Sequence, residues 1–100
     1  MIVGTLKESI EGLKKLMNTV KEAIENGNFE AVGASIPEFY GRIDTFRKGG
    51  ILEENVAKEF LAMLKIIERT AKKRDIARCK NLFQMLSGKI EAEFKKHHLV

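Results

Sequence analysis

The chain has 100 residues, of which 44% are hydrophobic and 32% charged, with one cysteine, one proline and a formal net charge of +4. This composition is too apolar and too evenly charged for a disordered chain, and a single cysteine excludes a disulfide framework. No apolar run approaches the roughly 20 residues that cross a bilayer, and residues 1–8 lack the pattern of a signal peptide. We therefore expect a single cytoplasmic domain spanning residues 1–100, with no membrane partner.

The first predicted helix spans about residues 5–26. Its apolar residues follow one another in steps of three and four, which places them along one helical face: Val3, Leu6, Ile10, Leu13, Met17, Val20 and Ile24. Thr5 and Glu8 fit a capping box, in which a hydroxyl and a carboxylate satisfy backbone amides at the start of a helix. The Asn26-Gly27-Asn28 segment indicates the end of the helix, because Gly and Asn tolerate the left-handed backbone conformation.

The second predicted helix spans about residues 29–48 and carries a proline near its middle. Its apolar stripe again steps by three and four: Phe29, Val32, Ile36, Phe39, Ile43 and Phe46. Pro37 lacks the amide that a helix interior needs and its ring clashes with the preceding turn. We therefore predict a kink at Pro37, or a break in which Ser35 caps a new helix. Gly49-Gly50 indicates where the helix ends.

Two further helices are predicted over about residues 52–71 and 75–96. The apolar residues of the last helix follow a different phase from those of the helix before it, so one straight helix would point its two halves at different neighbours. We therefore predict a turn near residues 72–74 with Asp75 as the N-cap. Four amphipathic helices joined by short turns predict an all-α, antiparallel up-down-up-down four-helix bundle. A dimer of helical hairpins is the alternative if that turn does not form.

The side chains that most often carry enzymatic chemistry are few in this sequence. His97 and His98 stand close to the C-terminus, and Glu93 with His97 makes the only i, i+4 acid–histidine pair, which is too few ligands for a metal centre. Cys79 lies on the apolar face of the last predicted helix, where a buried and inert thiol is expected. We predict a non-enzymatic protein with no catalytic residues, no metal, no cofactor and no small-molecule substrate.

Basic residues concentrate between Lys65 and Lys80, where seven basic side chains accompany two acidic ones. The candidate basic binding patch consists of Lys65, Arg69, Lys72, Lys73, Arg74 and Arg78. The first four follow the spacing of a single helical face, whereas the last two flank the start of the next helix. Such a patch fits phosphate backbones or acidic proteins, so a nucleic-acid-binding accessory protein is the alternative function. A favourable interaction with the helix dipole also accounts for these charges.

A second candidate surface consists of apolar residues outside the main stripes: Ile2, Leu16, Ala23 and Leu82. If exposed together, they form an apolar docking surface; otherwise they widen the core-facing side of their helices. Gly33 and Gly41 thin the 29–48 helix, which favours close packing of a neighbouring helix over a groove beside Pro37. The main functional hypothesis is a small partner-binding or assembly protein that acts through protein–protein contacts, with another protein or a second copy of itself as partner.

Overall fold

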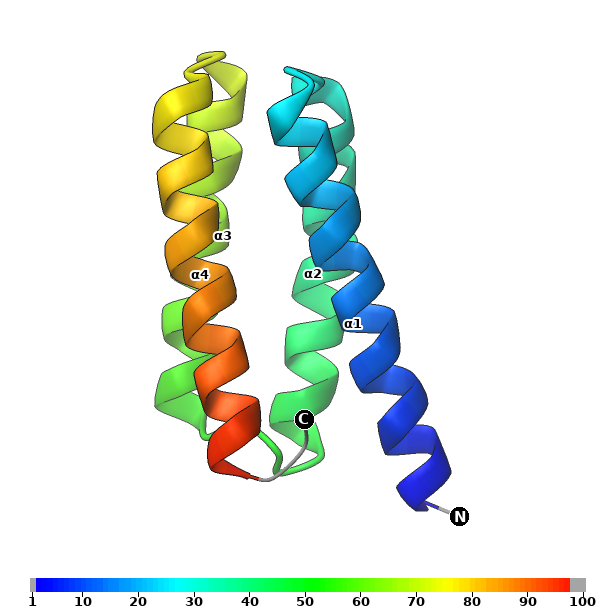
Figure 1. Cartoon of the computed structure of the whole chain (residues 1–100). Coiled ribbons are helices and arrows are strands. Elements are labelled where there is room, and N and C mark those ends of the chain that lie inside the picture. The colour runs from blue at the N-terminus through cyan, green and yellow to red at the C-terminus, as the bar shows by residue number, and fades with distance from the viewer. Residues whose placement is uncertain (1, 98–100) are drawn as a thin grey trace.

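The computed structural model describes residues 2–97, and their side chains from Leu6 onward, as four α-helices lying side by side (Figure 1). The helices are α1 (Ile2–Glu25), α2 (Phe29–Lys48), α3 (Glu54–Lys72) and α4 (Ile76–Lys96). The chain is therefore an all-α four-helix bundle. Successive helices alternate in direction in Figure 1, so the α1–α2 and α3–α4 turns lie at one end and the α2–α3 connection at the other. No helix in the described part of the chain has the length and apolar character needed to cross a membrane.

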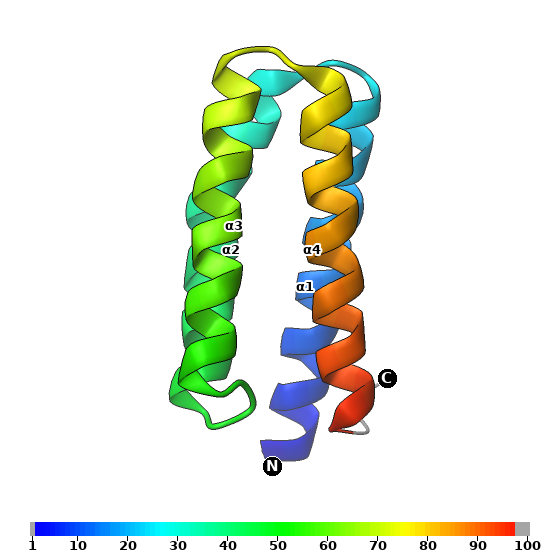
Figure 2. The same cartoon turned by 90° about the vertical axis from the view of Figure 1, so that its left-hand side faces the viewer.

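The apolar faces of the four helices meet along the axis of the bundle. Phe39 of α2 packs edge-on against Phe83 of α4, with the ring centroids 6.2 Å apart, and Phe46 packs against Phe94 at 5.3 Å. Each helix packs against two neighbours, while the pairs α1–α3 and α2–α4 face each other across the core (Figure 2). The α2–α3 pair packs most extensively and the α1–α4 pair least. The seam between the first and last helices is therefore the loosest of the four.

Helix α2 continues through Pro37 without a break. Ser35, the predicted cap of a new helix, lies inside α2, where its hydroxyl donates to the carbonyl of Ala31 at 2.8 Å. The amide that proline lacks would have bonded to the carbonyl of Gly33, so one helical hydrogen bond is missing there. Ile36, immediately before the proline, is fully buried, and this core packing on both sides of Pro37 keeps the helix continuous. The predicted break is wrong, whereas a kink stays a prediction.

The first turn of the bundle agrees with its prediction, but the start of α1 does not. Helix α1 begins at Ile2, so Thr5 lies inside the helix rather than at its N-cap. At the other end of α1, Gly27 adopts a positive φ of 70°. Asn28 then caps α2 by accepting a hydrogen bond from the amide of Ala31 at 3.2 Å. The Asn26-Gly27-Asn28 segment therefore lies where α1 ends and α2 begins, as predicted.

The connection between α2 and α3 places an apolar residue in the core before α3 begins. Helix α2 ends at Lys48, before the two glycines, and Gly50 adopts a positive φ of 78°. The amides of Ile51 and Leu52 both donate to the carbonyl of Phe46. Leu52 is buried. Helix α3 therefore begins at residue 54 rather than at the predicted residue 52, because Leu52 reaches the core from the connecting segment.

The turn between α3 and α4 forms where the change of phase predicted it. Helix α3 ends at Lys72, and Asp75 caps α4 by accepting a hydrogen bond from the amide of Arg78 at 3.1 Å. Arg74 has a φ of 58°, a left-handed conformation that costs a residue with a Cβ about 1–2 kcal/mol. Its side chain reaches the start of α2, with Nη2 3.0 Å from Oε1 of Glu30 and the guanidinium carbon 5.9 Å from the centre of the Phe29 ring. These exposed contacts bridge the two turns at this end of the bundle and contribute at most about 1 kcal/mol.

Candidate functional site

The acid–histidine pair at the end of α4 does not form part of a larger cluster. Nε2 of His97 lies 3.4 Å from Oε2 of Glu93, one turn earlier in the helix. Within the described residues, no group of three or more His, Cys, Asp or Glu side chains is arranged to hold a metal ion. His98 lies outside the described residues. These two side chains make a single helix-end pair.

Cys79 lies in the core of the bundle, between α3 and α4. Its side chain is fully buried and its Sγ atom is 4.0 Å from the carbonyl oxygen of Ile67. Burial raises the pKa of the Cys79 thiol, and the nearby Asp75 carboxylate raises this pKa further. Because the thiolate is the nucleophilic form of cysteine, this environment suppresses its reactivity.

The six residues of the predicted basic patch are all exposed, but the structure does not bring them together at one site. Arg69, Lys73 and Arg78 line a hollow of about 300 Å³ on the outer side of α3 and α4, which we call the α3–α4 hollow. Its other lining residues are Ile66, Thr70 and Asp75. Lys65 and Lys72 do not line this hollow, and Arg74 is turned toward α2. Of the predicted patch, therefore, only Arg69, Lys73 and Arg78 share one hollow, together with the carboxylate of Asp75.

The predicted apolar docking surface is corrected by the burial of its members. Leu16 and Ala23 are core residues, only 6% and 7% exposed. Leu82 is partly buried and packs against the same core. The side chain of Ile2 lies outside the described residues. The three described residues widen the core-facing sides of α1 and α4, which was the alternative interpretation, because each helix of a bundle has two neighbours to cover.

A groove that the sequence did not predict runs along the seam between α1 and α4. It consists of two adjoining hollows of about 510 and 320 Å³, which share Met17, Asn18 and Glu91. Apolar side chains form its floor: Met17, Ile24, Phe83, Ile90 and Phe94. Polar and charged side chains form its walls: Lys14, Asn18, Lys21, Glu25, Lys80, Gln84, Ser87, Glu91 and Lys95. We call this feature the α1–α4 groove.

The glycines inside the helices fall into two groups. At Gly33, Gly41 and Gly88 no neighbouring atom lies within 4 Å of where a Cβ would stand, whereas a Cβ at Gly12 would meet the guanidinium of Arg42. Close packing of a neighbouring helix, which we predicted for Gly33 and Gly41, is therefore wrong. Gly88 lies on the wall of the α1–α4 groove. A glycine is unfavourable inside a helix, so Gly88 is a sequence signal that could have drawn attention to this wall.

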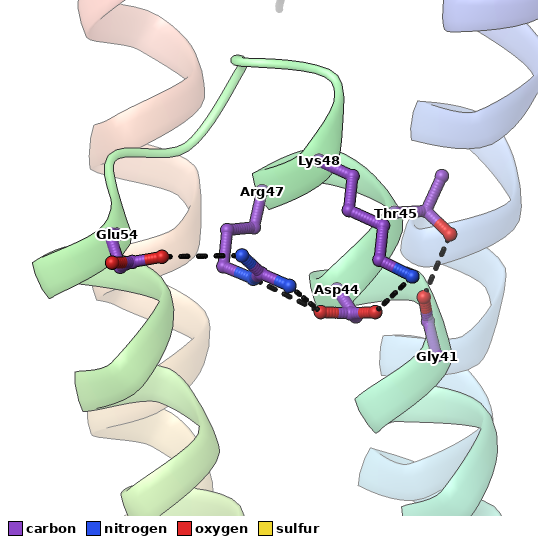
Figure 3. Close-up of polar contacts among 6 residues, drawn as sticks. All are labelled: Gly41, Asp44, Thr45, Arg47, Lys48 and Glu54. Carbon is purple, nitrogen blue, oxygen red and sulfur yellow. Dashed lines mark hydrogen bonds and ion pairs between the residues drawn. The ribbon is translucent and has the colours of Figure 1, made fainter.

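A cluster of ion pairs ties the end of α2 to the start of α3 (Figure 3). Asp44 accepts a hydrogen bond from Nη2 of Arg47 at 2.7 Å, and its other oxygen lies 3.2 Å from Nζ of Lys48. Arg47 also reaches Glu54 at 3.2 Å. Hydrogen bonds that Arg47 and Lys48 donate to Asp44 lower the pKa of the Asp44 carboxyl, and donation to this carboxylate raises the pKa of Arg47. Each carboxylate is paired with a cation, which is the pattern of a structural link.

No protein-family model, curated protein or solved structure matches this chain. Function is therefore inferred from the side chains of this protein and their arrangement. The α1–α4 groove and the α3–α4 hollow are the two features that bear on it.

Proposed function

We propose that this protein is a non-enzymatic binding protein that acts through protein–protein contacts, and that the partner occupies the α1–α4 groove. The observation that carries the proposal is the continuity of this groove, which joins two hollows over an apolar floor between polar walls. Grooves between helices are a recurrent docking site for protein segments, because the floor supplies apolar contact and the walls supply orientation.

The groove is a better candidate than the exposed apolar side chains elsewhere on the bundle. Among the side chains that the structure describes, Ile66, Ile76 and Met85 are the large hydrophobic residues with most exposure, and they come from separate turns of α3 and α4. Scattered apolar side chains are ordinary on a protein surface and need no partner. The groove, in contrast, gathers apolar and polar groups along one seam.

A photo-crosslinking amino acid placed at Gln84 tests this proposal in the living cell. Gln84 lines the groove, whereas Met85, its neighbour in sequence, is 56% exposed but lies outside the groove, and it serves as the matched control. We expect one discrete crosslinked product from position 84, identified by mass spectrometry, and none from position 85. A crosslink of equal yield at both positions, or at neither, would contradict the proposal. A product twice the mass of the chain would identify a second copy as the partner.

Nucleic-acid binding at the α3–α4 hollow is the second candidate function. It is favoured by Arg69, Lys73 and Arg78, which converge there and form no ion pair with any acidic side chain of the described chain. Three phosphate contacts would give a slope of about −2.7 when the logarithm of the association constant is plotted against that of the salt concentration. Titration of labelled single- and double-stranded oligonucleotides measures this slope. We expect the Arg69→Glu/Lys73→Glu variant to lose binding; unchanged binding would refute this function.

A further inference from the structure

We propose that the occupant of the α1–α4 groove is an amphipathic helix whose apolar stripe is flanked by aspartate and glutamate side chains. This inference rests on the function proposed above and names the chemistry of the partner. Three features of the groove support it: the charge of its walls, the small residues on one wall, and its shape.

The walls of the groove carry an excess of positive charge. Lys14 and Lys21 stand two turns apart on α1, and Lys80 and Lys95 stand near the two ends of the groove on α4. None of these four lysines forms an ion pair with a described acidic side chain. The lining includes only two carboxylates, those of Glu25 and Glu91. A partner with carboxylates along both edges of its apolar stripe would complement this distribution.

The α4 wall has its smallest side chains at its centre. Ser87 and Gly88 are adjacent there, and a Cβ at Gly88 would meet no atom within 4 Å. Glycine is unfavourable inside a helix relative to alanine, and no neighbour in the bundle requires it at this position. A gap of this kind lets the backbone of a docked helix approach α4 closely, as small residues do at tight helix–helix contacts.

The shape and chemistry of the groove fit a helix better than a strand. Along α4 the groove runs from Lys80 to Lys95, about 22 Å, which matches about four turns of helix. Both walls are α-helices, whose backbone amides and carbonyls already bond within each helix, so they offer an extended peptide no edge to pair with. A helix, in contrast, can insert one stripe of side chains between the two helical ridges that flank the groove.

A second copy of the chain fits the same groove poorly. In a symmetric dimer the same surface meets itself, so a groove lined by four lysines and two carboxylates would face a second groove of the same net positive charge. The chain as a whole is also basic, with a net charge of +4. Like charges at an interface disfavour association, so we expect the occupant to be a different, acidic chain.

Two synthetic helical peptides of about 16 residues test the inference. They share one apolar stripe at positions i, i+3, i+4 and i+7, but one carries Glu at the flanking positions and the other Lys. Fluorescence anisotropy measures the affinity of the folded full-length protein for each. We expect the Glu peptide to bind at least about tenfold more tightly than the Lys peptide, and to weaken as salt is raised. Equal affinities, or dissociation constants above about 1 mM for both, would overturn the inference.

Charge reversal in the groove supplies the specific readout. The Lys21→Glu/Lys80→Glu variant is expected to reverse the preference, so that the Lys peptide binds more tightly. Lys65→Glu/Lys72→Glu is the matched control: it makes the same change in net charge at two exposed lysines outside the groove, and the preference for the Glu peptide should persist. A reversal in both variants would show that only net charge matters and would overturn the inference.

A larger side chain on the α4 wall tests where the partner helix docks, separately from the charge of that helix. Gly88→Leu is expected to weaken binding of the Glu peptide by about tenfold or more, because its side chain fills the gap. Gly41→Leu, at an exposed helical glycine on α2 with equally open surroundings, should bind as the parent protein does. If both variants weaken binding of the Glu peptide equally, the peptide does not dock against the α4 wall.

The two levels of the argument fail separately. If the probe at Gln84 captures a partner but the peptides show no charge preference, the inference fails and the proposed function stands. If the crosslinker at Gln84 captures nothing and no peptide binds, both fail.

Discussion

Replacing Gly88 by alanine should stabilise this protein, and the size of the effect follows from the structure. Gly88 lies in the interior of α4 with no positive φ, so the helical backbone already suits an L-residue. No atom lies within 4 Å of the added Cβ, so the substitution creates no clash. The gain is therefore the difference in helix propensity between the two residues, about 0.8–1 kcal/mol.

This gain translates into a measurable shift of the melting temperature. A domain of this length has an entropy of unfolding of about 0.2 kcal/mol/K, so a stabilisation of 1 kcal/mol raises Tm by about 5 °C. Thermal unfolding followed by circular dichroism at 222 nm resolves such a shift. Gly27→Ala should instead destabilise the protein by about 1 kcal/mol, because Gly27 has a φ of 70°, which a residue with a Cβ adopts at a cost.

The contrast between the two alanine variants is the test of the reasoning. If Gly88→Ala lowers the melting temperature, a side chain of the bundle already occupies the space beside Gly88. The wall of the α1–α4 groove is then not open, and the docking argument loses its support. If both variants shift Tm in the same direction, backbone conformation is not what separates these two glycines.

Four further predictions follow from individual side chains. Leu16→Ala should lower the free energy of unfolding, measured in urea, by about 2–5 kcal/mol, because Leu16 is only 6% exposed. An unchanged free energy of unfolding would show that Leu16 is not a core residue. Arg74→Gly should be about 1 kcal/mol more stable than Arg74→Ala, because only the alanine keeps the strain of a positive φ. Cys79 should resist a thiol reagent until the protein unfolds, since burial raises its pKa; rapid native-state labelling would refute this. Asp44→Asn should lower Tm at pH 7, because the pKa of Asp44 is lowered on folding. The difference in Tm should be fully present above about pH 4 and shrink as pH falls through the lower folded pKa.

Local patterns were enough to predict most of the fold. The change of apolar phase after Ala71 located the α3–α4 turn although its conformation depends on Arg74 rather than on a glycine. The same patterns overestimated the effect of Pro37, because helix rules do not include the core packing that carries α2 past one missing hydrogen bond. They also placed the start of α3 too early, since Leu52 enters the core from outside a helix.

The candidate site was much harder to predict than the fold. A sequence shows that Lys14, Lys21, Lys80 and Lys95 are polar helix positions, but not that α1 and α4 bring them to one groove. That depends on how closely two helices pack, which is a tertiary property. The extent of the basic patch was hard to predict for a related reason: helical spacing groups the cations, but only Arg69, Lys73 and Arg78 line the hollow between α3 and α4. Binding by any of the six residues stays a prediction.

The connectivity of the bundle bears on why α1 and α4 pack least extensively of the four neighbouring pairs. Short turns join α1 to α2 and α3 to α4 at one end, where Arg74 also links the two turns to each other. At the other end the α2–α3 connection is reinforced by Arg47 and its two carboxylates (Figure 3). Among the four neighbouring pairs, only α1 and α4 have no connecting segment, so in the described part of the chain side-chain packing holds them together (Figure 2). A partner helix that entered this seam would strain no turn, because no segment joins α1 to α4.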